Sequence, residues 1–513
     1  MSKSRLLSTV AILLVLVFGL GALPASAGTV SDEPVTLTWF FPTNPSWQKL
    51  VTDLNEIMYF QEAEKITGVH IDWQVPPLGQ EKEQFNLMIN SGDLPDLIMH
   101  DTGVYSYPGG GDKAIEDGAY LRLNELIEEY APNYWALINS TDNFRSESKT
   151  DEGNIWGFSM VEANRQGAWT GMAIRQDWLD QLGLATPVTF DDWHSTLTAF
   201  KDELGAEAPL LIPTTGLTWD DSLIAGFDVG KSFFKIDDVV KFGPIEEGYR
   251  DYLTTLNQWY SEGLIDKDFS TRTAESTDAL IYNNKAGAWH EGFYMLNQRT
   301  KLADSDTFHL VGIAAPVRNV GDKAHLRQSN NYVRGYETSI SATCKTPEIA
   351  AKYLDFAYSP EGFMLSNYGI EGMTYELDEA GTPYLTDMML NDPNGLSINE
   401  TIHYYLFHHG PMNRVWDRDK DGYTDDENAC EAIWGTADDS YVMPPVTRNA
   451  DEGSRYATIM ADVEAYVNEM TVKFINGMAS LDEYDAFVEQ IKSMGIEEAI
   501  GIQQTALDRF LAR

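Results

Sequence analysis

Residues 171–200, GMAIRQDWLDQLGLATPVTFDDWHSTLTAF, contain the signals of a strand followed by two helices. The apolar run Met172 to Ile174 predicts the strand, and a short helical piece ends at Gly183. Thr189 is a good N-cap for the second helix, because its hydroxyl can accept a hydrogen bond from an orphan backbone N–H. Three residues then recur at the spacing of one buried helix face, namely Trp193, Leu197 and Phe200. The stretch therefore predicts strand, helix, capped turn and helix.

The amino-terminal region alternates strands with helices. Strands rich in β-branched and aromatic residues are predicted at 35–41, 69–75 and 97–99. Helices are predicted between them, at 47–66 and 80–90. The order β-α-β-α-β is typical of a parallel doubly wound sheet, so the predicted fold class is α/β. Ligands of such sheets bind beyond the carboxyl ends of the strands. This places Trp47, His100 and Asp101 at the edge of a cleft, with ordinary loop positions as the alternative.

Four stretches resemble the extracellular solute-binding proteins of carbohydrate ABC importers, and most of all their lipoprotein-type, alginate-binding-like branch. They are EKITGVHIDW (64–73), GDLPDLIMHD (92–101), RQDWL with TFDDW (175–193) and SPEGFMLSNYGIEGMTYE (359–376). The resemblance runs from about residue 35 to residue 513, and residues 380–450 match poorly. It implies the two-lobed periplasmic-binding-protein fold of type II, as in maltose-binding protein, with a hinge between the lobes.

The resemblance also implies where the lobes lie and what they do. The amino-terminal lobe is expected to comprise residues 28–155 and 315–375, and the carboxyl-terminal lobe residues 156–314 and 376–513. The expected function is capture of an oligosaccharide between the lobes and its delivery to the permease subunits of an ABC transporter. A monomer without enzymatic activity is expected.

Aromatic residues are the main candidates for the ligand site. Sugars present apolar C–H faces that stack on aromatic rings, and the chain contains 13 Trp, 25 Tyr and 22 Phe. Most of these rings are expected in the core. The resemblance implies a ring of the second lobe in the cleft at Trp289, and Trp219 and Trp169 are further candidates. Three more residues complete the predicted ligand site, namely Trp47, His100 and Asp101.

The acidic segment 417–427, DRDKDGYTDDE, is the strongest signal of a metal site. Oxygen ligands at positions 1, 3, 5, 7 and 9, with Gly at position 6, are the pattern of a loop that wraps calcium. A structural calcium site is therefore predicted, with ligands from Asp417, Asp419, Asp421, Tyr423, Asp425 and Asp426. Position 12 is Asn428 in place of the usual Glu, so Asp426 or Glu427 would have to supply that ligand. An acidic turn without metal is the alternative.

Composition limits the other functions that the chain can perform. A chain of 513 residues can bury a large core in two domains. Its net charge of −43 disfavours nucleic acids, whose phosphates need clustered Lys and Arg, and anionic membrane surfaces. Solubility accounts for this charge, and attraction of a cationic ligand is the alternative. The two cysteines, Cys344 and Cys430, either form a disulfide or remain buried thiols.

Residues 1–27 have the features of a secretory signal peptide. Two basic residues, Lys3 and Arg5, precede an apolar stretch, and Ala25 to Ala27 fits a cleavage site. The next residue is Gly28. Many members of the branch that this sequence resembles have a lipidated Cys at that position. We therefore expect an exported protein, periplasmic or extracellular, that is not lipid-anchored. An uncleaved signal acting as an anchor is the alternative.

The sequence contains no common catalytic motif. G-x-S-x-G, H-E-x-x-H, Walker A and a Gly-rich dinucleotide turn are all missing. A glycosidase could still use two of the 79 acidic residues. The alternative functions are therefore an exported enzyme acting on polysaccharide, a sensor subunit, or a peptide-binding protein of the same fold.

Overall fold

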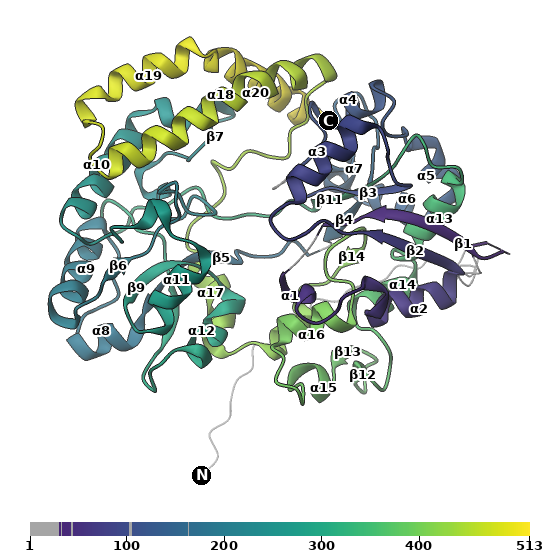
Figure 1. Cartoon of the computed structure of the whole chain (residues 1–513), viewed down its shortest axis with the longest axis horizontal. Helices are drawn as coiled ribbons and strands as arrows, with labels where there is room; N and C mark the ends of the chain where they lie inside the picture. Colours follow the sequence, from purple (N-terminus) through teal and green to yellow (C-terminus); the bar gives the residue numbers. More distant parts are fainter. Residues whose placement is uncertain (1–29, 32, 43–44, 102–104, 163) are drawn as a thin grey trace.

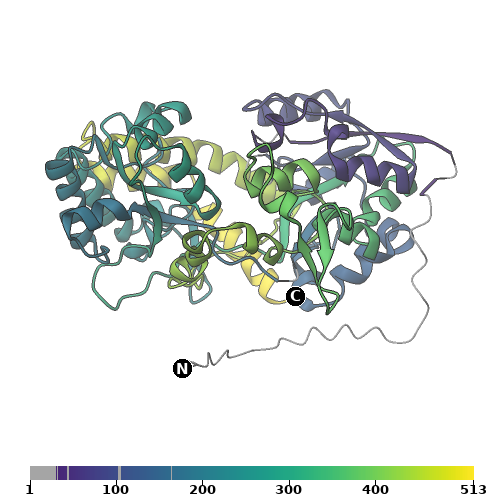
Figure 2. The ribbon, with the colours of Figure 1, turned by 90° about the horizontal axis from the view of Figure 1, so that it is seen from below.

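Two β-sheets with helices packed around them form two lobes that lie side by side (Figures 1 and 2). The computed structural model describes residues 30–31, 33–42, 45–101, 105–162 and 164–513. The predicted signal peptide therefore lies outside the described residues. Among the helices of these ranges, none is both long enough and apolar enough to cross a bilayer.

The first lobe is built on a six-stranded mixed sheet. Its strands, in spatial order, are β14 (Asn413–Arg414), β4 (Phe158–Glu162), β11 (Val333–Ile340), β3 (Leu97–Met99), β1 (Val35–Phe40) and β2 (Val69–Gln74). β1 pairs in parallel with both β2 and β3, which confirms the β-α-β-α-β pattern of the amino-terminal region. β11 runs antiparallel to β3 and β4, so a strand from late in the chain lies in the middle of the sheet.

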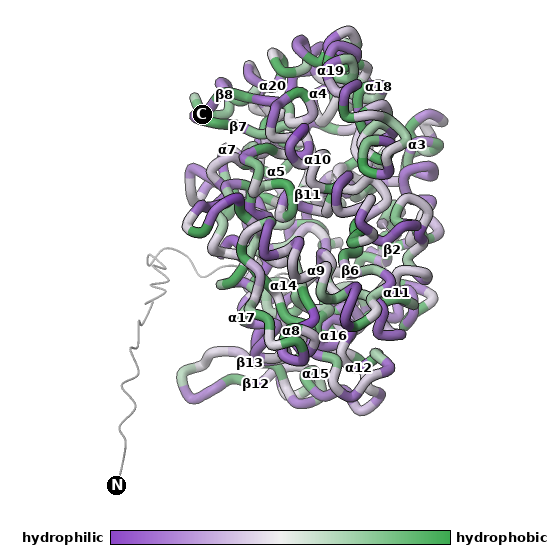
Figure 3. Tube along the Cα trace, turned by 90° about the vertical axis from the view of Figure 1, so that its left-hand side faces the viewer, coloured by the Kyte–Doolittle hydropathy of each residue, from purple (hydrophilic) through white to green (hydrophobic). Residues whose placement is uncertain are grey.

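The second lobe is built on a four-stranded sheet. Its strands are β10 (Leu310–Ile313), β5 (Thr170–Arg175), β9 (Ala286–Gly292) and β6 (Ala208–Leu210). β5 is antiparallel to both neighbours, whereas β6 and β9 are parallel. Two short hairpins lie outside the main sheets, β7–β8 (Phe233–Ile236, Val239–Phe242) and β12–β13 (Tyr375–Leu377, Pro383–Leu385). The β12–β13 hairpin projects from the body of the molecule (Figure 3).

Helices cover both sheets. Those that accompany the first sheet are α1 (Pro45–Gln48), α2 (Met58–Thr67), α3 (Glu81–Ser91), α4 (Gly110–Glu116), α5 (Asn124–Tyr130), α6 (Pro132–Ile138), α7 (Asp142–Glu147), α13 (Pro347–Phe356), α14 (Pro360–Asn367), α15 (Asp387–Leu390) and α16 (Ile398–Tyr405). Those that accompany the second sheet are α8 (Gln176–Leu182), α9 (Phe190–Leu204), α10 (Glu247–Ser261), α11 (Ala274–Tyr282), α12 (Leu296–Leu302), α17 (Asp425–Trp434), α18 (Ala450–Ile475), α19 (Tyr484–Ser493) and α20 (Ile496–Leu511). α18 packs on α10 and also contacts α4 of the first lobe.

Sheet membership shifts two of the expected lobe boundaries. β4 follows the expected crossing at residue 156 but still pairs in the first sheet. The segment from residue 376 was expected in the second lobe, yet its strand β14 pairs with β4. Apolar side chains of this segment also pack with Met58 of α2. The chain therefore crosses between the sheets at 164–169, 314–332 and 415–424, because pairing and apolar packing hold 376–414 on the first lobe.

Residues 171–200 have the predicted structure. β5, α8 and α9 follow one another, and the Thr189 hydroxyl accepts the N–H of Asp192, whose carboxylate accepts the N–H of Thr189 in return. This reciprocal capping box fixes the start of α9. The three residues of the predicted stripe are fully buried, namely Trp193, Leu197 and Phe200. Cys344 and Cys430 are free buried thiols, so the disulfide alternative is wrong.

A buried ion pair closes the end of β5. The guanidinium of Arg175 is fully buried and donates two hydrogen bonds to the Asp177 carboxylate, at 2.8 and 2.6 Å. It also lies over the rings of Trp178 and Phe308, 4.5 and 4.0 Å from their centroids. One carboxylate thus balances a charge that apolar rings surround, which makes the pair costly to break.

Replacing Asp177 by Asn is expected to lower the free energy of unfolding by about 3 kcal/mol, because the buried guanidinium loses its counter-charge. Denaturant unfolding followed by fluorescence measures this loss. The double variant Arg175→Met with Asp177→Asn removes the charge as well and is expected to be more stable than Asp177→Asn alone. Equal stability of the single and double variants would contradict the role of the buried charge.

Candidate functional site

A cavity of about 460 Å³ lies between the lobes, and we call it the central cavity. Side chains from the first lobe and from the start of the third crossing segment line one side, namely Lys49, Tyr336, Ser397, Asn399, Glu400, His403, His408, His409 and Trp416. Side chains from the crossing segments and the second lobe line the other, namely Gln166, Trp169, Phe293, Tyr294, Met295, Gln298 and Tyr423. The cavity is therefore rich in aromatic rings from both lobes.

Pairing of β5 with β9 places the rings of the second lobe. Thr170 pairs with Gly292, so Trp169 and Phe293 leave the sheet next to each other, and the Phe293 N–H donates to the Trp169 carbonyl at 3.1 Å. The ring of Tyr294 then lies nearly parallel to that of Trp169, with centroids 6.4 Å apart and an interplanar angle of 23°. Both rings line the central cavity, and an aromatic ring can stack on the apolar face of a sugar.

Hydrogen bonds to the second crossing segment fix the orientation of Trp169. Its backbone N–H donates to Oε1 of Gln328 at 2.9 Å, and its indole N–H donates to Oδ1 of Asn330 at 3.3 Å. Asn330 in turn donates to Oε1 of Gln166 at 3.0 Å. The first two crossing segments are thus bonded to each other where they border the cavity, and a ring so held is pre-oriented for a ligand.

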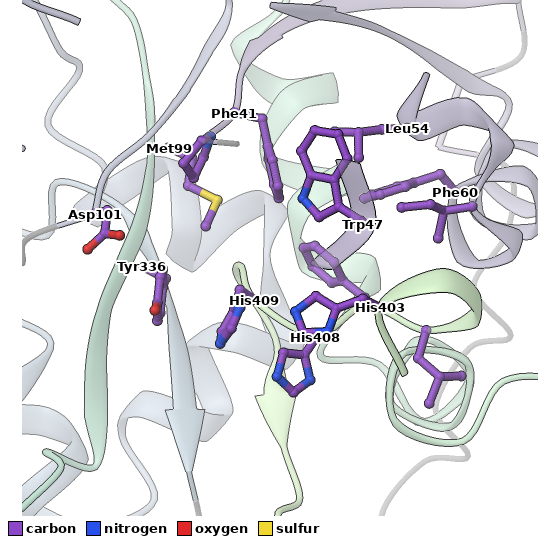
Figure 4. A pocket seen from close by; sticks show the side chains of 14 residues that line it. Phe41, Trp47, Leu54, Phe60, Met99, Asp101, Tyr336, His403, His408 and His409 are labelled. Carbon is purple, nitrogen blue, oxygen red and sulfur yellow. The ribbon is translucent and has the colours of Figure 1, made fainter. Parts of the chain in front are cut away.

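A smaller pocket of the first lobe opens beside the central cavity, and we call it the first-lobe pocket (Figure 4). Both cavities share the side chains of Tyr336, His403, His408 and His409. Trp47, Phe41 and Phe60 supply an aromatic wall, and Asp101 lies at the far side beyond Tyr336 (Figure 4). The two cavities are therefore neighbours, and their polar groups lie among aromatic side chains.

Burial controls the charge of several groups around the site. It lowers the pKa of His403 to about 4 and that of His408 well below its usual value. Both imidazoles are therefore neutral at pH 7. Burial also raises the pKa of Glu337 to about 8, and the negative charge of Asp101 acts in the same direction. The Oε2 atom of Glu337 is shielded from solvent and has no hydrogen-bond partner among the described residues, so this carboxyl is protonated at pH 7.

The structure brings together three of the six predicted ligand-site residues. Trp47 and Asp101 line the first-lobe pocket, and Trp169 lines the central cavity. His100 does not reach either one, because it is 0% exposed and packs against Trp156 and other rings behind β11. Its place within the sheet, where its N–H donates to the Glu337 carbonyl, turns the imidazole into the core.

The two other predicted tryptophans lie away from the lining. Trp289 is 4% exposed, belongs to the core of the second lobe and donates its indole N–H to Glu291 at 3.0 Å. It sits within β9, whereas the rings that line the cavity follow the end of that strand. Trp219 is 60% exposed and contacts His290 edge-on. Trp289 itself therefore does not line the cavity, and the rings that do, Phe293 and Tyr294, lie a few residues further along the chain.

Sequence reasoning missed most of the rings that form the cavity. These are Phe293, Tyr294, Tyr336, Trp416 and Tyr423. It also missed His408 and His409. They lie in a loop before β14, where both line the cavity. The doublet of histidines next to a short strand was the available signal.

The carboxylates of the acidic segment 417–427 do not gather at one point in this structure, and the calcium site stays a prediction. Residues Asp417–Gly422 form a 3-10 helix, and α17 begins at Asp425 with Thr424 as its N-cap. The side chains take separate partners: Asp417 pairs with Lys420 at 2.8 Å, Asp419 with Arg418 at 2.8 Å, and Asp426 with His309 at 2.8 Å. Asp421 and Asp425 are exposed, and Tyr423 turns its ring to the cavity. No acidic cluster with metal-ligand spacing occurs in the described part of the chain.

Two α/β lobes joined by crossing segments, with an aromatic cavity between them, define a two-lobed solute-binding protein. The model of the bacterial extracellular solute-binding protein family matches residues 42–362, which is more than half of the chain. The chain belongs to this family. This finding confirms the predicted family and the predicted two-lobed fold class.

Individual relatives agree with this assignment. The chain is 24% identical over 524 aligned residues to the fructooligosaccharide ABC transporter substrate-binding protein FusA of Streptococcus pneumoniae serotype 4, with 94% of this chain and 91% of FusA covered. The alginate-binding protein AlgQ2 without calcium ion superposes with a TM-score of 0.79 at 27% identity, over 94% of this chain and 99% of AlgQ2. A FusA EF-hand mutant in complex with fructo-nystose superposes with a TM-score of 0.75 at 23% identity, over 93% and 99%.

Replacing Glu337 by Gln is expected to stabilise the protein in alkaline solution. The folded state keeps this carboxyl protonated up to about pH 8, whereas the unfolded chain ionises it near its usual value of 4.5. Its contribution to stability is therefore present at low pH and is lost as pH rises through that window. The amide stays neutral in both states, so the midpoint gain of the variant should appear at about pH 9 and vanish at about pH 5.

Thermal unfolding at both pH values measures this difference. The matched substitution Glu348→Gln, at an exposed carboxylate on α13, is expected to leave the pH dependence as it is. A gain for Glu337→Gln that is the same at both pH values would contradict a neutral Glu337.

Proposed function

We propose that this protein captures an oligosaccharide in the central cavity and delivers it to the permease subunits of an ABC importer. The observation that carries the proposal is the aromatic lining of the central cavity, with the stacked rings of Trp169 and Tyr294 on one side and Tyr336 and Trp416 on the other. Aromatic faces bind the C–H faces of sugars. The names of the relatives support this reading, since FusA is described for fructooligosaccharides and AlgQ2 for alginate.

Polar side chains between the rings suit the hydroxyl groups of such a ligand. Amides of Gln166, Gln298 and Asn399 line the central cavity, and each offers both donors and an acceptor. A sugar hydroxyl also donates and accepts, so amides match it better than a fixed charge does. The lobes would close on the ligand by bending at the three crossing segments.

Several further properties belong to the same proposal. We also propose that the protein is exported and not lipid-anchored, which the predicted signal peptide and Gly28 after it support, and that it acts as a monomer. Absence of enzymatic activity is supported by the relatives, whose names describe binding. An exported enzyme acting on polysaccharide, a sensor subunit and a peptide-binding protein are the competing functions.

Thermal unfolding against fructooligosaccharides, uronate oligomers and peptides tests the ligand class, because a ligand that binds only the folded state raises the midpoint. One class of oligosaccharide is expected to give a saturable shift and to be recovered intact. Trp169→Ala and Tyr294→Ala should each weaken its binding by about tenfold, through loss of a stacking face. Tyr384→Ala, on the exposed hairpin strand β13, is the matched control and should bind normally.

Each other outcome identifies a competing function. Cleavage of the bound glycan would favour an enzyme, and a shift from peptides alone would contradict carbohydrate binding. Normal affinity of the Trp169 and Tyr294 variants would move the site away from the central cavity.

We infer that the acidic segment 417–427 is held by protein cations in place of calcium. Asp419 is buried between Arg418 and Arg414, whose Nη2 lies 3.7 Å from its Oδ2, and a calcium ion would have to displace both guanidiniums. Two similar structures are described as AlgQ2 without calcium ion and as an EF-hand mutant of FusA, which points to calcium binding in those relatives.

Neither calcium nor a chelator is therefore expected to move the unfolding midpoint of this protein. Differential scanning calorimetry with calcium and with EGTA measures the effect. A saturable rise with calcium that Asp421→Asn removes would restore the predicted calcium site.

A further inference from the structure

Three histidines meet on the floor of the cleft. His403 lies on α16, and His408 and His409 lie in the loop that leads to β14 (Figure 4). Their ring centroids are 4.2 Å (403–408), 4.3 Å (408–409) and 5.7 Å (403–409) apart. One ring nitrogen of each lies within 4.8 Å of the others, and no other such group of metal-ligating side chains occurs in the described ranges.

Two of these histidines each have a buried ring nitrogen without a hydrogen-bond partner among the described residues. Nδ1 of His403 lies 2.7 Å from the Asn399 carbonyl, so it carries the proton and leaves a lone pair on Nε2. That Nε2, like Nδ1 of His408, has no hydrogen-bond partner among the described residues. The two residues are only 5% and 9% exposed. Leaving such atoms unsatisfied is costly, and each such case calls for a cause.

We propose that His403, His408 and His409 bind one divalent transition-metal ion at the floor of the cleft. Imidazole nitrogen suits Zn²⁺ and its neighbours in the first transition row, whereas calcium and magnesium require oxygen ligands. Three imidazoles around a tetrahedral Zn²⁺ place their ring centroids about 5 Å apart, and the observed spacings lie on either side of this value. The Asn399 carbonyl orients His403 as the partners of metal-bound histidines do.

Arg414 opposes this site and gives it a distinctive signature. Its Nη2 lies 3.4 Å from Nε2 of His408, at the long end of hydrogen-bond distances. A metal on Nδ1 of His408 moves the ring proton to Nε2, so this contact becomes one between two donors. The carboxylate of Asp419 lies 3.7 Å from the same guanidinium and offsets part of its charge. Metal binding therefore costs a weak hydrogen bond and satisfies two orphan nitrogens.

The location connects the metal to the cleft. All three histidines line both the central cavity and the first-lobe pocket, so the coordination positions that they leave open face these cavities. Oxygen atoms of a ligand or water can fill those positions. The proposal rests on the histidine geometry alone and stands apart from the identity of the sugar.

Titration of the purified protein, free of any affinity tag, with Zn²⁺ in a calorimeter tests the proposal. One saturable equivalent is expected, and Co²⁺ is expected to give the visible absorption of a tetrahedral nitrogen site. His403→Gln, His408→Gln and His409→Gln should each weaken Zn²⁺ binding by about tenfold or more. His70→Gln and His309→Gln are matched controls, since these histidines are exposed and lie outside the cluster.

Arg414→Gln is the variant that separates a metal site from a buried hydrogen-bond cluster. A glutamine oxygen can accept the Nε2 proton of His408, so Zn²⁺ should bind about tenfold more tightly. Thermal unfolding without metal shows that each variant is folded, and His409, the most exposed of the three, provides the variant that perturbs the core least. The proposal is overturned if Zn²⁺ does not bind, or if binding survives in the three histidine variants and is lost in His70→Gln or His309→Gln.

Discussion

The direct passage of the chain from β4 to β5 is the constraint on which the rest of the site depends. β4 is held in the first sheet by β11 and β14, and β5 is held in the second sheet by β9 and β10. Each of these two strands has a neighbouring strand on both sides in its own sheet. Both ends of the segment that connects them are therefore fixed. Trp169 is the last residue of that segment, and the amides of the second crossing segment hold its ring at the border of both lobes.

Local signals sufficed for the elements that the sequence predicted correctly. The capped turn at Thr189 and the buried stripe of α9 depend on residues within one helix, and the amino-terminal alternation depends on strand and helix periodicity. The segment 376–414 has local signals too, such as the amphipathic helix α16, but these do not assign it to a lobe, and its membership in the first lobe depends on pairing of β14 with β4. That pairing joins residues about 250 positions apart, which no local pattern encodes.

The same distinction explains the candidate site. Residues along β9 are all buried, so Trp289 was a sound choice for an important ring and a wrong one for the cavity wall. The end of that strand, where Phe293 and Tyr294 turn out of the sheet, is decided by its register with β5. Trp47 and Asp101 line the first-lobe pocket where the sequence placed them, because the carboxyl ends of parallel strands meet at one edge, a rule that needs topology alone.

The two guanidiniums beneath the cleft link the acidic segment to the histidines. The spacing of the acidic residues predicts a calcium loop. The sequence shows where the carboxylates are along the chain, and it does not show which cationic side chains lie beside them in the fold. Arg414 and Arg418 both lie beside the buried Asp419 carboxylate and balance its charge. Arg414 also reaches His408 and lies over the ring of Trp416, 3.3 Å from its centroid. Arg414 thus contacts the acidic segment, an aromatic ring of the cavity wall and an imidazole of the histidine cluster, and after burial its positive charge is the next cause that lowers the pKa of His408.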